Sequence, residues 1–272
     1  MSLRSLRKRV PTALVLLLLV FLVMQFAPRL VFFLFLQVVV LASLIEFYNL
    51  FRLKKLFPQK TLGILLALII STSFYYSAKF PLELALFLCL LLAGLFYVIS
   101  FNTLEKLVTF PSSVSITVFG PLYLSFTLNY FYHLREERGP FYIYFLFAVI
   151  FLGDTGAYFF GKLWGRRKMV PMASPRKTWE GSFGGILFAV LGALLARQVL
   201  LRSVPLWKAL VSGMLIHAVA QLSDPLESLF KRGVGVKDSS KVLPGHGGVL
   251  DRIDSLILGA PFFYYVIKFF WS

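Results

Sequence analysis

Apolar runs long enough to cross a bilayer recur along this chain from residue 11 to residue 271, and they limit its possible folds more than any other feature. A helix needs about 20 apolar residues to cross the hydrocarbon core, where only helices and closed barrels satisfy their backbone groups. Charged residues make up 15% of the chain, against about 25% in an ordinary soluble domain. The sequence therefore predicts an all-α, polytopic integral membrane helical bundle.

The apolar runs predict about nine transmembrane helices. We expect them at residues 11–27, 30–50, 61–78, 82–100, 108–132, 140–161, 178–200, 205–230 and 249–271. The first run is longer than the apolar region of a usual signal peptide and lacks a cleavage site, so we interpret it as a retained span. Pro111, Gly120 and Pro121 interrupt the fifth run, which we therefore expect to face protein rather than lipid.

The distribution of Lys and Arg predicts the orientation of the chain. With the N-terminus inside, 20 of the 28 basic residues fall on inner segments and 6 on outer segments. The positive-inside rule then places the C-terminus outside and the polar motifs in the cytoplasm. The net charge of +16 is spread over short loops, so it indicates contact with anionic lipid and not nucleic-acid binding.

Polar residues shift toward the C-terminal half, which predicts a transmembrane scaffold at 1–105 and a catalytic region at 106–272. Within the scaffold Glu46 is an exception, and we expect it to pair with Arg52 or Lys55 in a structural role. Cys89 is the only cysteine, which excludes an intrachain disulfide. No internal repeat is visible, which weakens the case for a transporter built from inverted repeats.

Two polar clusters precede the last two apolar runs. The first contains Asp154 within Asp-Thr-Gly-Ala-Tyr, near the inner end of its run. The second runs from Ser174 through Arg176 and Lys177 to Gly181. Since Ser-Pro is a good pair for a helix start, we expect a helix to begin there. Two bases beside the free N–H groups of its first turn would then bind a phosphate.

The third cluster brings acids, bases and glycines together between the last two apolar runs. Asp224 and Glu227 are three residues apart, as are Asp251 and Asp254, so each pair shares a helix face. Two such pairs can hold one or two Mg²⁺ ions, whose other ligands are water and substrate phosphates. His217 lies in an apolar run, where we expect a buried and hydrogen-bonded side chain.

At these residues the chain resembles the bacterial phosphatidate cytidylyltransferases, also called CDP-diacylglycerol synthases. The family signature has the form S-x-x-K-R-x4-K-D-x-[GSA]-x2-[LIF]-[PGS]-x-H-G-G-x-x-D-R-x-D, and residues 228–254 fill it in order. Asp-Thr-Gly-Ala-Tyr and a Ser-Pro-Lys-Lys-Thr-Trp-Glu-Gly element also match, with Arg176 in place of a lysine. Ser223 and Pro225 depart from the family's usual Gly-Asp-Leu. The motifs cover about residues 154–254.

The resemblance implies transfer of the cytidylyl group of CTP to phosphatidic acid, with pyrophosphate released, for phospholipid biosynthesis. It implies an integral protein of the bacterial cytoplasmic (inner) membrane with its site facing the cytoplasm. The implied partners are CTP, phosphatidic acid and membrane lipid, and the implied cofactor is Mg²⁺, with Mn²⁺ as a substitute and one or two ions bound. The sequence leaves oligomeric state open, a homodimer included.

The candidate residues fall into three groups. The catalytic candidates are Asp224, Asp251, Lys237 and Asp254. The substrate-binding candidates are Ser174, Arg176, Lys177, Lys231, Arg232, His246, Gly247, Gly248 and Arg252. The metal-binding candidates are Asp224 and Asp251, which lead, with Asp154, Glu227 and Asp254.

Two other classes remain open from the residues themselves. One is another membrane phosphotransferase, such as a CTP-dependent polyprenol kinase or a sugar-phosphate transferase. The other is an ion-coupled transporter, for which acids inside the membrane are the usual indication. The acids here gather toward one face beside loops rich in Gly and Lys, which favours an enzyme.

Overall fold

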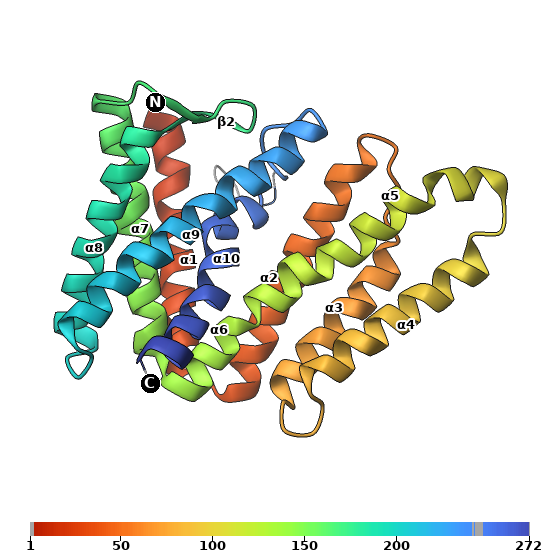
Figure 1. Cartoon of the computed structure of the whole chain (residues 1–272), viewed down its shortest axis with the longest axis horizontal. Coiled ribbons are helices and arrows are strands. Elements are labelled where there is room, and N and C mark those ends of the chain that lie inside the picture. The colour runs from red at the N-terminus through yellow and green to blue at the C-terminus, as the bar shows by residue number, and fades with distance from the viewer. Residues whose placement is uncertain (1–2, 241, 243–246, 272) are drawn as a thin grey trace. The chain divides into compact units, whose positions relative to one another are not determined.

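A computed structural model describes residues 3–240, 242 and 247–271. The helices are α1 (Leu3–Phe26), α2 (Arg29–Arg52), α3 (Lys60–Tyr75), α4 (Leu82–Ser100), α5 (Leu104–Gly120), α6 (Tyr130–His133), α7 (Pro140–Leu163), α8 (Trp179–Leu200), α9 (Leu206–Gly233) and α10 (Leu250–Val266). Three π-helical segments adjoin these helices: η1 (Pro121–Phe126), η2 (Leu134–Arg138) and η3 (Ile267–Trp271). The described residues contain one sheet, which consists of two strands, β1 (Lys168–Val170) and β2 (Ser174–Thr178). Figure 1 shows these elements.

The predicted all-α polytopic membrane bundle is confirmed. Seven described helical stretches are long and apolar enough to cross a membrane, and two shorter apolar helices, Leu14–Phe26 and Lys60–Tyr75, lie where the first and third spans are predicted. The count of nine spans is therefore not confirmed, although every predicted run is helical. The fourth helix, Leu82–Ser100, has the predicted bounds.

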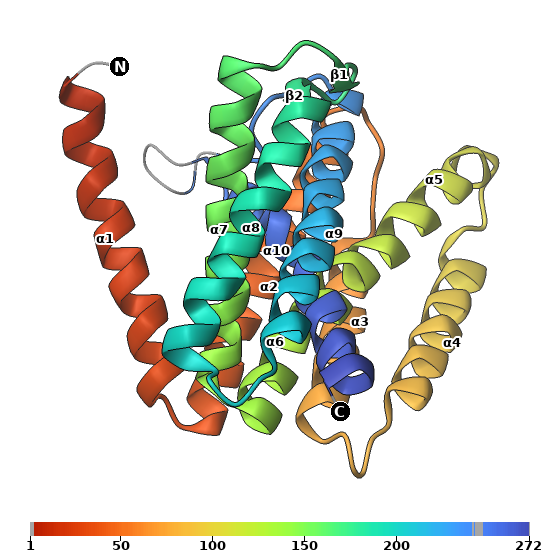
Figure 2. The same ribbon diagram turned by 60° about the vertical axis from the view of Figure 1, so that its left-hand side comes forward.

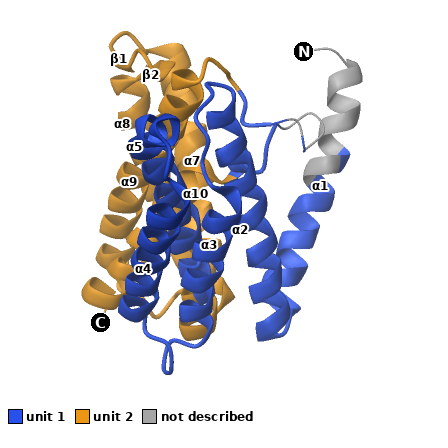
Figure 3. Cartoon of the chain, turned by 90° about the vertical axis from the view of Figure 1, so that its right-hand side faces the viewer, with its two compact units in different colours: residues 1–132, 238–252 blue, residues 133–237, 253–272 orange. Residues whose placement is uncertain are grey.

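The chain divides into two compact units, coloured separately in Figure 3. Unit 1 consists of Met1–Tyr132 and Asp238–Arg252, and unit 2 of His133–Lys237 and Ile253–Ser272. These are units of packing and not of function, so the predicted division between a scaffold at 1–105 and a catalytic region at 106–272 stays a prediction.

Unit 1 buries polar groups along the interrupted fifth run, as predicted for a segment that faces protein. Pro121 has no N–H to continue the α-helical pattern, and the chain widens there into η1. Thr117 is fully buried; its carbonyl oxygen accepts a hydrogen bond of 2.7 Å from the Tyr48 hydroxyl. One turn beyond η1, the buried Asn129 accepts a hydrogen bond of 3.0 Å from Gln37. Neighbouring helices thus satisfy the polar groups of this segment.

Unit 2 is built on close packing of α7 against α8 and of α8 against α9, and the three helices run side by side in Figure 2. Glycines allow the approach of α7 to α8. A Cβ atom on Gly156 would lie 2.5 Å from the Phe188 Cβ and 2.7 Å from the Gly184 carbonyl oxygen. Small residues at such an interface let two backbones come together, which is how membrane helices gain packing energy.

The predicted helix start at Ser174 is wrong. Residues Ser174–Thr178 form strand β2, which pairs antiparallel with β1 in a short hairpin beyond the ends of α7 and α8 (Figure 2). Pro175 favours an extended conformation at the residue before it. Thr178 is the actual N-cap, since its hydroxyl accepts a hydrogen bond of 3.2 Å from Gly181 N. Arg176 and Lys177 therefore lie on a strand, and the phosphate-site argument from a helix first turn does not hold.

Candidate active site

The hairpin in unit 2 places one base directly against an acid of α9. The Lys177 Nζ atom lies 2.8 Å from Asp224 Oδ2, and both side chains are partly exposed. The same nitrogen lies 3.4 Å from the carbonyl oxygen of Gln221, one turn earlier on α9. Arg176, the preceding residue of β2, is exposed, and Ser174 is half-buried at the start of the strand. The second and third sequence clusters thus meet at Lys177 and Asp224.

Three carboxylates of unit 2 lie within electrostatic range of one another. Asp224 acts electrostatically on both Asp154 of α7 and Asp254 of α10, and Asp154 also acts on Asp254. Ser255 donates a hydrogen bond of 3.3 Å to Asp154 Oδ2. Like charges repel at such range, and a positive group among the three carboxylates reduces that repulsion. Lys177 is one such group, because it acts on Asp154 as well as on Asp224.

Two further predicted residues, Glu227 and Lys231, form a buried pair one turn along α9. The Lys231 Nζ atom donates a hydrogen bond of 2.8 Å to Glu227 Oε1, and both side chains are buried. Both residues lie on α9, so the ammonium group neutralises the buried carboxylate whether or not a substrate is bound. The pair is therefore explained by packing, and the roles predicted for Glu227 in metal binding and Lys231 in substrate binding stay predictions.

The last turn of α9 and the stretch after it expose two predicted bases, Arg232 and Lys237. Arg232 donates a hydrogen bond of 2.8 Å to the Val236 carbonyl oxygen, across a turn in which Gly235 has a φ of +84°. That φ favours glycine, since side chains are strained there. Arg232 thus shapes the turn that leads to Lys237, and the side chain of Lys237 is exposed.

Asp251 belongs to unit 1, where its carboxylate binds two residues of the family signature, Ser239 and Gly248. Its carboxylate accepts hydrogen bonds from Ser239 N at 2.9 Å, from Ser239 Oγ at 2.9 Å and from Gly248 N at 2.8 Å. Gly247 adopts a φ of +86° beside it. Arg252 is exposed, and His246 lies outside the described residues. The structure therefore assigns Asp251 and Gly248 a part in loop geometry, in addition to their predicted roles.

The carboxylate oxygens of this cluster suit a hard cation such as Mg²⁺, but they do not form a complete set of protein ligands. Within the described residues, no group of three or more His, Cys, Asp or Glu side chains is arranged to hold a metal ion. Magnesium commonly takes one or two protein carboxylates and completes its shell with water and substrate phosphates. The carboxylates of Asp154, Asp224 and Asp254 fit that pattern by chemistry.

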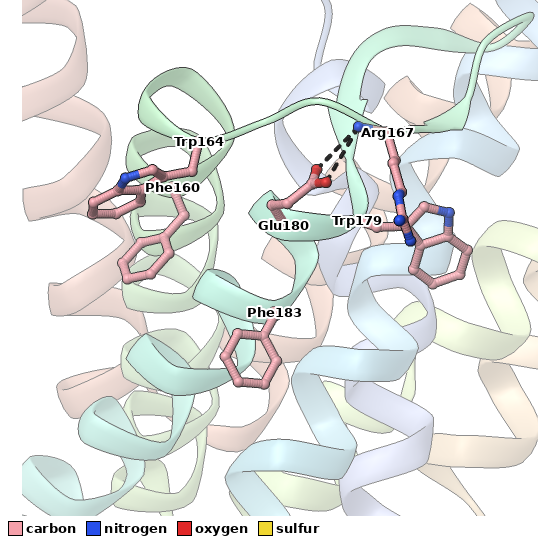
Figure 4. Close-up of a pocket in the computed structure, with 6 residues that line it drawn as sticks. All are labelled: Phe160, Trp164, Arg167, Trp179, Glu180 and Phe183. Carbon is pink, nitrogen blue, oxygen red and sulfur yellow. Dashed lines mark hydrogen bonds between the residues drawn. The ribbon is translucent and has the colours of Figure 1, made fainter.

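A separate open groove of about 520 Å³ lies at the end of α7 and α8 (Figure 4). Aromatic side chains form most of its wall, together with Arg167 and Glu180. The Glu180 carboxylate accepts hydrogen bonds of 3.0 Å from Arg166 N and 3.2 Å from Arg167 N, which fixes the loop before β1. The groove shares no residue with the acids or bases of the candidate site, and we assign it no part in the chemistry.

Two residues differ from their sequence-based interpretation. His217 is buried as expected, packed against Gly153 and Gly185, but neither ring nitrogen has a hydrogen-bond partner among the described residues. Glu46 binds the segment at residues 239–250, and among the described residues it forms no ion pair with the predicted Arg52 or Lys55. No local sequence signal shows this, since the partners are about 200 positions away.

The fold and these contacts define a polytopic membrane protein with acids and bases gathered on neighbouring helices and a hairpin. Comparison with known proteins gives the family: a model of the cytidylyltransferase family matches residues 7–270. The chain belongs to the cytidylyltransferase family.

Two curated relatives carry the same name. The phosphatidate cytidylyltransferase of Staphylococcus epidermidis is 41% identical over 171 residues, which is 63% of this chain and 65% of that protein. The phosphatidate cytidylyltransferase of Bacillus subtilis is 37% identical over 191 residues, which is 70% of this chain and 69% of that protein. The match thus spans about two-thirds of the length of these relatives.

Proposed function

We propose that this chain transfers the cytidylyl group of CTP to phosphatidate, giving CDP-diacylglycerol and pyrophosphate. Its family and the names of its relatives support that activity. The structural observation that carries the proposal is the contact of 2.8 Å between Lys177 and Asp224, with Asp154 and Asp254 in electrostatic range. This arrangement brings a base of the hairpin together with acids of α7, α9 and α10. Two anionic substrates need both: bases to bind their phosphates and acids to bind a metal ion.

The reaction needs charge control more than it needs a general base. A phosphatidate oxygen is already anionic near neutral pH; it forms a bond to the α-phosphorus of CTP while the bond to the bridging oxygen of pyrophosphate breaks. No proton has to leave the nucleophile. The obstacle is repulsion between two polyanions, and Lys177 with Arg176 and Lys237 would reduce it by binding phosphate oxygens.

Magnesium is the proposed cofactor, with Mn²⁺ as its substitute, and one or two ions would be bound. Asp224 and Asp251 remain the leading proposed ligands; the geometry of unit 2 also supports Asp154 and Asp254, and Glu227 is the least favoured because Lys231 occupies it. A bound Mg²⁺ would screen the phosphates and stabilise the leaving pyrophosphate. Lys177 would hold Asp224 in position before the metal–nucleotide complex arrives.

Lys237 is the base that we expect to contact phosphate most directly. Lys237→Ala should lower cytidylyl transfer by about 10- to 150-fold, because a charge-assisted contact to phosphate is lost. Lys79→Ala is the matched control, since Lys79 is also exposed but lies between α3 and α4. Rates should be measured in neutral detergent, where anchoring to anionic lipid makes no contribution. Full activity of Lys237→Ala there, with unchanged affinity for both substrates, would leave Lys237 only a lipid-anchoring role.

We further propose that the protein lies in the bacterial cytoplasmic membrane, with its N-terminus and candidate site in the cytoplasm and its C-terminus outside. The bias of basic residues supports this orientation. In a Cys89→Ala background, Val242→Cys should react with a membrane-impermeant maleimide only after cells are opened, and a cysteine appended at the C-terminus should react on intact cells. Labelling of both from the same side would disprove the topology. A homodimer stays a prediction.

The proposed activity is tested directly with purified protein. With Mg²⁺ and CTP labelled at the α-phosphate, phosphatidate should give labelled CDP-diacylglycerol, and omission of the lipid should give none. With CTP labelled at the γ-phosphate, a polyprenol should give no labelled lipid. Product from the polyprenol but not from phosphatidate would instead support the polyprenol kinase class. Solute uptake by proteoliposomes with no lipid product would support the transporter class.

A further inference from the structure

Glu46 is a buried carboxylate on an otherwise apolar stretch of α2. Its side chain is only 5% exposed, and the neighbouring Leu44 and Phe47 are fully buried. An ionised carboxylate inside a membrane helix is costly unless several donors surround it. The nearby bases Arg52 and Lys55 form no ion pair with Glu46 among the described residues, so the groups that do donate to its carboxylate indicate its role.

Glu46 accepts hydrogen bonds from four groups, two on residues 239–240 and two on residues 249–250. Oε1 accepts from Ser240 Oγ at 2.7 Å and from Val249 N at 3.1 Å. Oε2 accepts from Ser239 Oγ at 3.0 Å and from Leu250 N at 3.0 Å. The Glu46 carboxylate therefore binds both pairs of residues, 239–240 and 249–250.

The two amides belong to the start of α10, where the N–H groups have no partner within the helix. Glu46 thus caps α10 from another helix, with its negative charge at the positive end of the helix dipole. The two hydroxyls belong to the stretch directly after Lys237. Both contacts lie within unit 1, and they hold the segment that carries the family signature.

Gly248 packs against the contact between Ser239 and Glu46, so a side chain at position 248 would displace one of these two groups. A Cβ atom on Gly248 would be 1.9 Å from Ser239 Oγ and 2.3 Å from Glu46 Oε2. Asp251 also binds this stretch, through the amides of Ser239 and Gly248, and it shares the single hydroxyl proton of Ser239 with Glu46. Residues of this stretch therefore contact two carboxylates, that of Glu46 on α2 and that of Asp251 on α10.

We propose that Glu46 is a positioning residue, which fixes residues 239–240 and 249–250 and thereby sets the position of Asp251. It acts through the segment and not by contact with substrate. The effect on rate rests on the proposed function, whereas the effect on the segment does not. The N-terminal helices then do more than scaffold the protein, because α2 supplies a residue that orders the signature.

The test compares Glu46→Gln with Glu46→Asp. The Gln side chain has the same size but lacks the charge, and its NH₂ group would face donors where an acceptor is needed. Glu46→Asp keeps the charge and the acceptors on a shorter side chain, so it should recover part of the effect. Ser43→Ala is the matched control, since Ser43 is buried on α2 and donates 2.7 Å to Val39 O of its own helix.

Two readouts are measured on the purified full chain. By hydrogen exchange, peptides with Ser239, Ser240, Val249 and Leu250 should exchange faster in Glu46→Gln, while peptides of α8 stay protected. Cytidylyl transfer should show kcat lowered by about 10- to 100-fold with a smaller change in KM. Ser43→Ala should change neither.

Three outcomes overturn the proposal: unchanged exchange at residues 239–250, equally faster exchange throughout the protein, or faster local exchange with wild-type kcat. An inactive wild-type protein would contradict the proposed function instead. The exchange experiment would then still decide whether Glu46 holds the segment.

Discussion

Replacing Asp224 by Asn will lower cytidylyl transfer by about 100- to 1,000-fold, the scale seen when one preorganised electrostatic contact is removed from an active site. Asn keeps the size of the side chain and can still accept from Ser228 Oγ, which lies 3.3 Å from Asp224 Oδ1. It removes the charge that pairs with Lys177 at 2.8 Å. The loss should therefore appear in kcat at saturating Mg²⁺ and CTP, with little change in thermal stability.

Two further variants separate catalysis from structure. Glu105→Gln neutralises an exposed acid in the first turn of α5, far along the chain from the motifs, and should retain the wild-type rate. Lys177→Gln tests the pair itself: combined with Asp224→Asn, it should cost much less than the sum of the single effects, as expected for residues in contact. A near-normal rate for Asp224→Asn at limiting Mg²⁺ would exclude Asp224 from both catalysis and metal binding.

A single methyl group on Gly156 will destabilise unit 2 markedly. In Gly156→Ala the new Cβ would meet the Phe188 Cβ at 2.5 Å and the Gly184 carbonyl oxygen at 2.7 Å. The second of these is backbone, so α7 and α8 must move apart. Overpacking of this kind costs about 1–3 kcal/mol, and Gly156→Val should cost more. Thermal unfolding in detergent, followed by size-exclusion chromatography, should show a lower Tm for both variants.

Gly94→Ala provides the matched control on α4. A Cβ atom there has no heavy atom within 4 Å, and alanine is the better helix former. Its Tm should equal or slightly exceed that of the wild type. Equal melting of Gly156→Ala and Gly94→Ala would show that α7 and α8 do not need the close approach at Gly156.

The sequence predicts the membrane fold well because the signal is local. Each apolar run contains the hydrophobic length that a span requires, so Leu82–Ser100 has the predicted bounds and α8 begins within one residue of the prediction. The interruption at Pro121 is also local, since a missing N–H alters the hydrogen-bond pattern wherever the residue stands. The separate prediction of a helix start at Ser174 is the exception, because pairing of β2 with the nearby β1 makes residues 174–178 extended.

The candidate site could be predicted only in part. Residue types and short spacings pointed to Asp154, Lys177 and Asp224, and the structure brings these three side chains into electrostatic range. The joint metal binding that the shared helix face of Asp251 and Asp254 suggested stays a prediction. The contacts of each carboxylate could not be predicted: Asp251 accepts hydrogen bonds from Ser239 and Gly248, and Asp254 lies in electrostatic range of Asp154 and Asp224.

By itself, then, the sequence determined the helical class, the positions of the helices and the chemical character of the site, because hydrophobic length and residue type are properties of short segments. Only the tertiary structure decided the partners. Glu46 meets Ser239 and Ser240 across nearly 200 residues, and Lys177 meets Asp224 across 47 positions. A buried carboxylate must find donors, but which donors reach it depends on how distant helices pack, and no local pattern records that.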